Sequence, residues 1–389
     1  MEPLATSKRV LTWLCLLPAK KNTTKWERGS YVALLLALIV SDVTVALSSF
    51  LYILNFKSHD LQDISIALFQ FLATIPVANT IIVAFIHRHK IPAVLDKLSK
   101  FYGKYKDDDS LRFLTQANNR SEWFWDLFFK FVLGGFIGIF STLSVASVLL
   151  CLMWNGYFDV ALVFHPCRYI LPWDQSTIPG YFAEIAFSIL TAECYIVYNG
   201  AILLSFVSIC LHHQAFYNIF YYSLRKLGRP NEKELLCDLV DFHNSIKSWF
   251  SETADIYSPH FMVQLIINVL MLAIFVFQLD QQISKHFEIY ALFLFLFGTL
   301  LFTTNLFLCC FFGKLASESY KQMSDSLYDY DWHELPLYLQ KQFIIMIAGA
   351  QIPLDYYGYG IITLNLETFC ALLRAVYTYY MIIKTLSTE

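Results

Sequence analysis

The chain has 389 residues, of which 57% are hydrophobic and only 15% are charged, and its formal net charge is −3. Soluble domains carry nearer to about 25% charged residues, so this composition excludes an ordinary soluble protein. Length alone would allow two or three soluble domains. The apolar runs described below predict instead one all-α polytopic membrane domain, because lipid-exposed backbone must satisfy its own hydrogen bonds.

Seven apolar runs are long enough to cross a bilayer, which takes about 20 residues in a helix. They cover residues 31–55, 64–86, 127–156, 181–210, 260–279, 287–312 and 357–386. Ahead of the first run, residues 7–19 are predicted as an interfacial helix, because four basic residues follow them where a signal peptide would be cleaved. In the third run, Gly134-x-x-x-Gly138 would permit the close approach of another helix.

Lys and Arg are distributed very unevenly between the two sides of the membrane that these runs define. If the N-terminus starts inside, only Lys57, Arg168, Lys285 and Lys384 fall outside, against 23 Lys and Arg inside. The positive-inside rule therefore predicts a cytoplasmic N-terminus and an extracellular C-terminus. This orientation opposes a seven-helix G-protein-coupled receptor, as does the absence of Asn-Pro-x-x-Tyr from the last run.

No catalytic constellation is found in the sequence. It contains no phosphate-binding glycine loop, no H-E-x-x-H, no nucleophile elbow and no Cys-x-x-Cys. His212 and His213 are adjacent and cannot share one helix face, so they do not predict a metal site. We expect neither an enzyme nor a bound cofactor or metal. Glu193 in the fourth run is the stronger of two intramembrane carboxylate candidates, the other being Glu184.

The last part of the chain combines a helix that ends near Gln351 and Pro353 with a long apolar helix that carries a polar stripe. Residues 7, 11 and 18 positions after Glu367 return to one line along a helix that turns about 100° per residue. The stripe therefore consists of Glu367, Arg374, Thr378 and Thr385. An ionisable stripe in a spanning helix should line water or contact protein, and hydrogen bonding across a packed bundle is the alternative.

Several short motifs resemble those of insect odorant receptors. They are Gln351-x-Pro353, Leu366-Glu367-Thr368-Phe369, Leu373-Arg374-x-x-Tyr377-Thr378-Tyr379 and, before the fourth run, Leu171-Pro172-Trp173-Asp174. The resemblance implies that the last helix lines a cation-conducting pore at the centre of a tetramer. It places the gate at Ile382, Thr385 and Leu386, where a hydrophobic ring can close a pore by dewetting. Gustatory receptors share this topology, but their Gln-Phe ending is missing after Thr378-Tyr379.

The resemblance also implies a division of the chain. Residues 1–312 would hold six transmembrane helices with an odorant pocket in their outer half, and segments 88–126 and 213–258 would extend into a cytoplasmic anchor. Residues 313–352 would complete the anchor, and 353–389 would form the pore-lining helix. Because the family's co-receptor has a longer second cytoplasmic loop than segment 213–258, the chain resembles an odour-tuning subunit that forms a heterotetramer with co-receptor subunits.

The expected ligand is a small, volatile, apolar odorant, and no nucleic-acid partner is expected. Depth and helical face select candidate pocket positions on runs two, three, four and six, namely Phe69, Leu72, Ala73, Ser147, Cys151, Ala192, Tyr195 and Phe293. Ligand binding would favour the open state of a pore formed by Glu367, Arg374, Thr378, Ile382, Thr385 and Leu386, through which Na⁺, K⁺ and Ca²⁺ pass. The resemblance implies a multi-pass protein in the plasma membrane of olfactory neuron cilia or dendrites.

Overall fold

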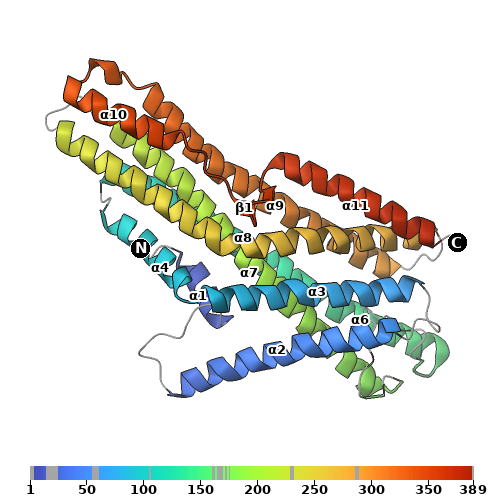
Figure 1. Cartoon of the computed structure of the whole chain (residues 1–389). Helices are drawn as coiled ribbons and strands as arrows, with labels where there is room; N and C mark the ends of the chain where they lie inside the picture. The colour runs from blue at the N-terminus through green and yellow to red at the C-terminus, as the bar shows by residue number, and fades with distance from the viewer. Residues whose placement is uncertain are drawn as a thin grey trace.

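The structure is a computed structural model that describes residues 4–14, 25–54, 61–104, 107–159, 163, 170, 173–174, 176–227, 232–284 and 289–387. These residues form long helices and one short antiparallel β-hairpin (Figure 1). The all-α architecture predicted from the composition is therefore confirmed. Figure 1 shows the two ends of the chain well apart, with the C-terminus at the tip of the last helix.

The elements follow one another along the chain with few long connections. They are α1 (Ala5–Trp13), α2 (Lys25–Leu54), α3 (Leu61–Ile86), α4 (Lys90–Lys104), α5 (Asp108–Leu127), a π-helix η2 (Phe128–Leu133), α6 (Gly134–Asn155), α7 (Ile178–Leu224), α8 (Glu232–Ser284), α9 (Ile289–Tyr328), a 3₁₀ turn η4 (Trp332–Glu334), α10 (Leu337–Ala350), β1 (Tyr357–Gly358), β2 (Ile362–Thr363) and α11 (Leu366–Leu386).

Six helices of the described chain are long and apolar enough to cross a membrane. Their residue ranges are Leu35–Leu54, Asp63–Ile86, Ile178–Leu224, Lys233–Ser284, Ala291–Tyr328 and Leu366–Leu386. The third predicted run, 127–156, corresponds to η2 and to α6, a helix of 22 residues from Gly134 to Asn155. The other six predicted runs coincide with the six long apolar helices.

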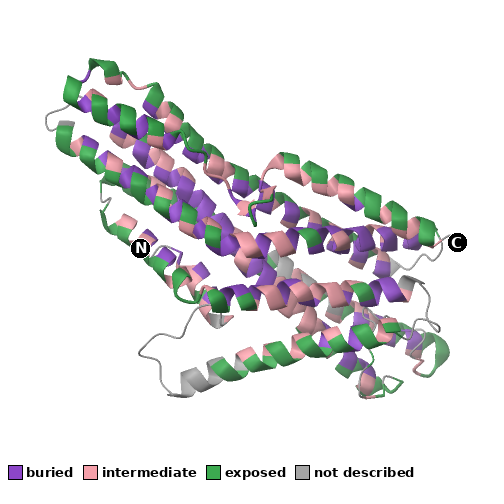
Figure 2. Ribbon diagram, in the orientation of Figure 1, coloured by how far each residue is buried: buried purple, intermediate pink, exposed green. Residues whose placement is uncertain are grey.

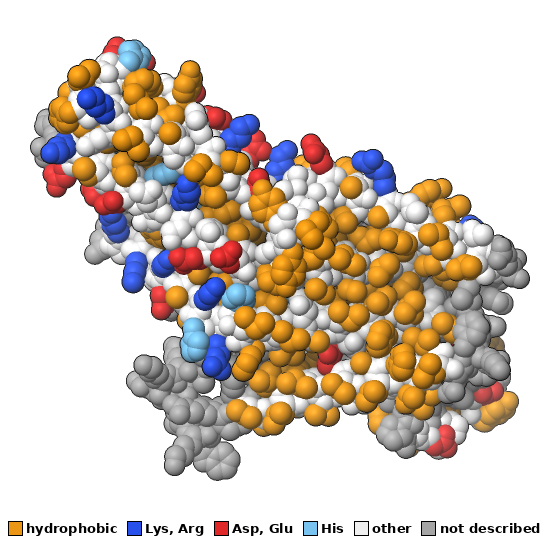
Figure 3. Space-filling model, in the orientation of Figure 1, with side chains coloured by type: hydrophobic (Ala, Val, Ile, Leu, Met, Phe, Trp, Pro, Cys, Tyr) orange, Lys and Arg blue, Asp and Glu red, His pale blue; other side chains and the backbone are white. Residues whose placement is uncertain are grey.

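Three of these helices continue well past a membrane's thickness. At about 1.5 Å per residue, a spanning helix needs roughly 20 residues, whereas α7 has 47, α8 has 53 and α9 has 40. The start of α8, the end of α9 and α10 project together to one end of the molecule (Figure 1). We call this projecting part, with the end of α7, the extension. Charged side chains gather on it, and apolar side chains cover much of the remaining surface in the view of Figure 3.

Local signals at the helix ends explain several of the boundaries. Thr177 caps α7 by accepting a hydrogen bond from the N–H of Gly180, and Pro179 lies in the first turn, where proline is tolerated. Asn365 caps α11 by accepting from the N–H of Thr368 at 2.7 Å. The helix α10 ends at Ala350, just before Pro353, as the sequence predicted.

The predicted last span begins later than expected. Residues 357–363, the start of the predicted span, are not helical. They form the β1–β2 hairpin, in which Tyr357 pairs with Thr363 and Gly358 pairs with Ile362. Its turn contains Gly360 at φ 69°, a left-handed conformation that favours glycine. A Cβ on Gly358 would lie 3.1 Å from the backbone of Met262 in α8, so the hairpin lies tightly against that helix. The predicted span at 357–386 is therefore shortened to Leu366–Leu386.

The N-terminal helix α1 packs on other helices, and residues 15–19 of the predicted interfacial helix lie outside the described residues. Its Ser7, Val10 and Leu11 are buried, and Ser7 accepts a hydrogen bond from the indole N–H of Trp125 in α5 at 2.9 Å. The hydroxyl of Tyr198 in α7 donates to the carbonyl of Leu14 at 2.9 Å. The predicted helix exists, but it packs on α5 and α7, because its apolar face finds a protein partner there.

The Gly134-x-x-x-Gly138 motif lies on an open part of the described surface. A Cβ on Gly138 would meet no described atom within 4 Å. That this motif permits the close approach of another helix stays a prediction.

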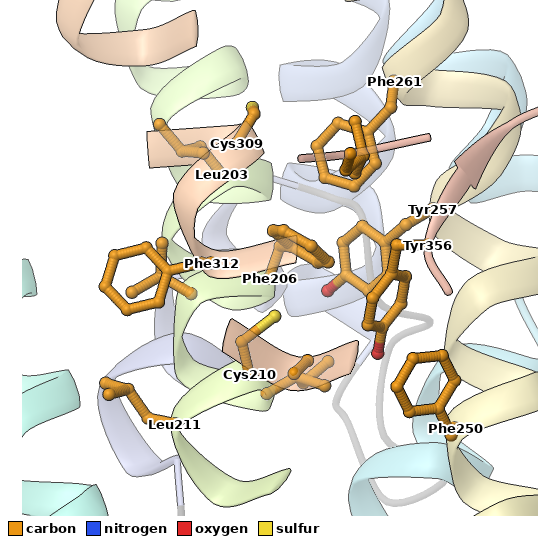
Figure 4. Close-up of a cluster of buried hydrophobic side chains, with 14 of the residues drawn as sticks. Leu203, Phe206, Cys210, Leu211, Phe250, Tyr257, Phe261, Cys309, Phe312 and Tyr356 are labelled. Carbon is orange, nitrogen blue, oxygen red and sulfur yellow. The ribbon is translucent and has the colours of Figure 1, made fainter. Parts of the chain in front are cut away.

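A buried aromatic cluster joins the extension to the segment that leads into α11 (Figure 4). Tyr356 lies at its centre, with its ring centroid 4.5 Å from that of Phe250 and 4.9 Å from that of Phe206. The Tyr356 hydroxyl forms hydrogen bonds with Thr253 Oγ1 at 2.7 Å and His213 Nε2 at 3.2 Å. Burial raises the pKa of Tyr356 well above its usual value, so the hydroxyl keeps its proton.

Removing the Tyr356 hydroxyl tests this junction. Tyr356→Phe leaves Thr253 and His213 without this shared partner, so we expect it to destabilise the folded protein by about 1–2 kcal/mol, measured as a lower thermal midpoint of the purified protein. Tyr359→Phe, the same change at a position of the hairpin turn that is 62% exposed, is the matched control. Equal midpoints for the two variants would contradict a structural role of the hydroxyl.

Candidate functional site

A cavity of about 400 Å³ lies between the helices of the apolar part. Its wall is contributed by α2, α3, α7, α8 and α9, and by the end of α5 with the first residue of η2. This volume is within the range of about 300–1,000 Å³ that is typical of small-molecule sites. Its wall is mostly apolar, so it suits a ligand of low polarity.

Aromatic rings make up one side of the wall and contact one another in edge-to-face and tilted pairs. The ring centroids of Phe69 in α3 and Phe275 in α8 are 4.6 Å apart, and Phe302 of α9 lies 5.4 Å from Phe275. Tyr195 of α7 closes the group at 6.1 Å from Phe302. A Cβ on Gly298 would lie 2.0 Å from the Phe275 ring, so the missing side chain makes room for this ring.

A short series of buried amides begins at the cavity and runs between α8 and α9. The Tyr195 hydroxyl donates to Asn268 Oδ1 at 3.5 Å. Asn268 Nδ2 donates to Asn305 Oδ1 at 2.8 Å, and Gln264 Nε2 donates to the same oxygen at 3.1 Å. Tyr195 and Asn305 both line the cavity, so its shape is linked to the packing of α8 on α9.

Half of the predicted pocket residues lie at this cavity. Phe69, Ala73, Ala192 and Tyr195 line it. Leu72 packs half-buried against the core beside it, and Phe293 is 58% exposed. Residues Ser147 and Cys151 are buried elsewhere, in a small group with Tyr181, where the Ser147 and Tyr181 hydroxyls lie 3.3 Å apart.

Among the described side chains of the third predicted run, the first two line the cavity. Leu127 and Phe128 line it, whereas α6, which holds Ser147 and Cys151, packs on the start of α7 through Tyr181. Depth along the run does not predict which of its residues line the cavity, because lining depends on how α6 packs against neighbouring helices.

The sequence analysis missed two groups of lining residues. Phe275 and Gln278 of α8 line the cavity, although the fifth run was not expected to contribute. Asp42 of α2 lines it as well. The sequence held a signal for both groups, since Asp42 and Gln278 are polar residues within apolar runs, and such residues usually face a cavity or a partner.

The helix α11 holds the predicted pore residues on its uncovered side (Figure 2). All six are exposed, Ile382 by 50% and Leu386 by 63%, and the others are Glu367, Arg374, Thr378 and Thr385. In the most apolar stretch of α11 only 6% of the residues are buried, which is the lowest share among the six long apolar helices. The six predicted pore residues therefore lie on one side of α11, and nothing in the described part of the chain covers that side.

The opposite side of α11 is fixed at both ends. The ring of Phe369 lies 5.6 Å from that of Phe307 in α9. Near the other end, the Lys384 ammonium is 2.9 Å from the carboxylate of Asp280 in α8 and donates to the Tyr380 hydroxyl at 3.0 Å. Asp280 comes two residues after the cavity residue Gln278. The helices that line the cavity are thus the helices that hold α11.

The fold and the sequence both have known relatives. The chain is similar to the olfactory receptor OR5 from Machilis hrabei, solved in complex with eugenol, with a TM-score of 0.76 and 15% identity over 98% of each chain. A second structure of that receptor matches with a TM-score of 0.72 and 15% identity over 97% of this chain and 96% of that one.

A curated sequence relative is Odorant receptor 82a from Drosophila melanogaster, which is 20% identical over 221 residues. The alignment covers 55% of this chain and 56% of the relative, so the chain spans about half the length of the curated relative it matches. The model of the family described as 7tm Odorant receptor matches residues 60–377, which is most of the chain, and the protein therefore belongs to the insect odorant receptor family.

Proposed function

We propose that this chain is an odour-tuning subunit of an odorant-gated, non-selective cation channel. It binds a small, mostly apolar volatile molecule in the cavity between α2, α3, α7, α8 and α9. It assembles with co-receptor subunits into a heterotetramer in the plasma membrane of olfactory neurons. The observation that carries this proposal is the apolar cavity, whose walls α8 and α9 also hold α11.

The cavity suits a ligand that is recognised by shape and dispersion. Phe69, Phe275 and Phe302 present ring edges and faces in contact with one another. Many weak contacts of this kind add up to substantial affinity without strict geometry. OR5 was solved in complex with eugenol, and an aromatic volatile of that size is of the class we propose for this chain.

Opening follows from a population shift between two arrangements of α8, α9 and α11. A ligand that binds the open arrangement more tightly favours it in proportion to the difference in affinity. Ligand contacts reach α8 at Phe275 and Gln278, and α8 holds the end of α11 through the Asp280–Lys384 ion pair. A small shift of α8 would therefore move Ile382 and Leu386, and Na⁺, K⁺ and Ca²⁺ would pass.

Two uncovered surfaces support assembly with other subunits. The first is the polar and apolar face of α11 described above. The second is on α10, where Ile345 is 72% exposed beside Leu337, Tyr338 and Ile344, while Phe343 and Ile347 face the core. Contiguous exposed apolar groups on a domain surface typically mark contact sites. In this proposal the extension is the cytoplasmic anchor, and α10 contacts neighbouring subunits there.

Whole-cell recording tests the function directly. The chain is expressed alone and with a co-receptor, and a panel of volatiles is applied. Odorant-evoked cation current that requires the co-receptor supports a tuning subunit. Responses to tastants without a co-receptor would favour a gustatory-type channel, and current abolished by uncoupling G proteins would contradict a channel.

Filling the cavity should reduce sensitivity. The bulky side chain in Ala192→Trp occupies the ligand's space, so we expect the half-maximal odorant concentration to rise by about tenfold or more. Leu190→Trp places the same ring two residues away on the same helix, where Leu190 is 61% exposed, and it should respond like the unmodified channel. A similar loss in both variants would show that the cavity is not the ligand site.

Trimming the predicted gate should make the closed channel leak. Leu386→Ala shortens an exposed apolar side chain on the proposed pore face, so dewetting weakens and the standing current without odorant should rise severalfold. Ile383→Ala, which trims the packed side of the same turn, serves as the control. An unchanged standing current in Leu386→Ala, with normal surface expression, would remove Leu386 from the gate.

A charge on α10 should disrupt assembly. Ile345→Lys places an ammonium in the proposed subunit contact, and we expect the fraction of chain recovered in the heterotetramer to fall by about fivefold or more, measured by size-exclusion chromatography. Leu111→Lys, at an exposed apolar position of α5, is the control. Normal assembly of Ile345→Lys would show that α10 does not contact other subunits.

A further inference from the structure

The cavity contains a carboxylate that the apolar odorant just described would leave unused. Asp42 faces the cavity from α2, on the same side of that helix as Leu38 and Val45, which also line it. It is the one carboxylate among the described lining residues, and none of these is Lys, Arg or His. Ionisable side chains within spanning helices are costly and usually serve a ligand, an ion or a partner.

No group of the described chain satisfies this carboxylate. It takes part in no hydrogen bond or ion pair there, and the group near enough to interact with it electrostatically is the uncharged thiol of Cys194 in α7. Lys and Arg residues pair with other acids, for example Lys97 with Glu252 and Lys384 with Asp280. Asp42 therefore has room for a cation that comes from outside the chain.

A second acceptor lies on α7 at the same cavity. The side chain of Asn199 is 3% exposed, and its Nδ2 donates to the carbonyl of Tyr195 at 2.9 Å. That bond orients the amide, and its buried Oδ1 is left without a hydrogen-bond partner in the described structure. A buried acceptor without a donor costs free energy that a donating ligand recovers.

We propose, resting on the odorant-binding function above, that the preferred ligands of this cavity are small aliphatic or aromatic primary amines, whose ammonium pairs with Asp42. A remaining N–H reaches Asn199 Oδ1 directly or through one water. The hydrocarbon part packs on Phe69, Phe275 and Phe302, and aromatic faces are themselves favourable to a cation.

Other ligand classes satisfy this pair of groups less well. An ester or ketone has only acceptor oxygens, so it would need a protonated Asp42 and would leave Asn199 Oδ1 without a donor. An alcohol supplies a single donor and no charge. An ammonium supplies three donors and the opposite charge, and hydrogen bonds between charged groups are the stronger kind.

Three ligands of equal size separate these cases. Hexylamine, hexan-1-ol and heptane are titrated by calorimetry against the full chain in lipid nanodiscs, and the same ligands are applied in whole-cell recordings with the co-receptor. We expect hexylamine to bind about tenfold or more tighter than heptane. Asp42→Asn should abolish that preference while leaving heptane binding unchanged.

A matched control and a second variant make the test independent of folding problems. Glu193→Gln removes a carboxylate on α7 that does not line the cavity, and the amine preference should survive it. If Asp42→Asn does not fold, Asn199→Leu is used, and it should reduce the preference for hexylamine over heptane severalfold.

Equal affinities for the three ligands, or an amine preference that persists in Asp42→Asn, would overturn the inference. Odorant-evoked current without amine preference would overturn it and leave the channel function standing. Asp42-dependent binding of hexylamine without any current would support the amine site and contradict the proposed channel.

Discussion

The structure depends most on the burial of Tyr356 between the extension and the start of α11. This residue has no strand or helix of its own, yet its ring packs against Phe206 of α7 and Phe250 of α8. Its hydroxyl is shared with Thr253 and His213, and its carbonyl accepts the N–H of Leu364 at 2.9 Å. Two helices and the hairpin segment are thereby held together at one point, just before α11 begins.

The long helices α7, α8 and α9 connect this junction to the cavity and to α11. Each helix runs without a described break from the extension into the apolar part, although Pro259 lies inside α8. The same helices line the cavity and hold α11 through Phe307 and Asp280. Because packed helices move as nearly rigid bodies, contacts at the cavity, the extension and the last helix are mechanically related.

The sequence predicted what depends on periodicity and local chemistry. The polar stripe through Glu367 and Arg374 is present on one exposed face, because helical geometry alone determines it. The end of α10 before Pro353 follows from the missing N–H of proline. Four of the eight positions predicted for the ligand line the cavity, because lining depends on how α6 and α8 pack, and a run of apolar residues contains no information about a helix's neighbours. Ser147 lies away from the cavity, and Phe275, which lines it, was not among the predicted positions.

The division of the cavity wall among several helices has a consequence for the divergence of such receptors. Some of its side chains, such as Ala192, line the cavity and are not part of the buried core around Tyr356 and Trp249. Single substitutions there can change the shape of the site at little cost in folding. A lineage can therefore explore new chemical preferences while its architecture stays the same, and relatives at 15% identity still share this fold over 98% of the chain.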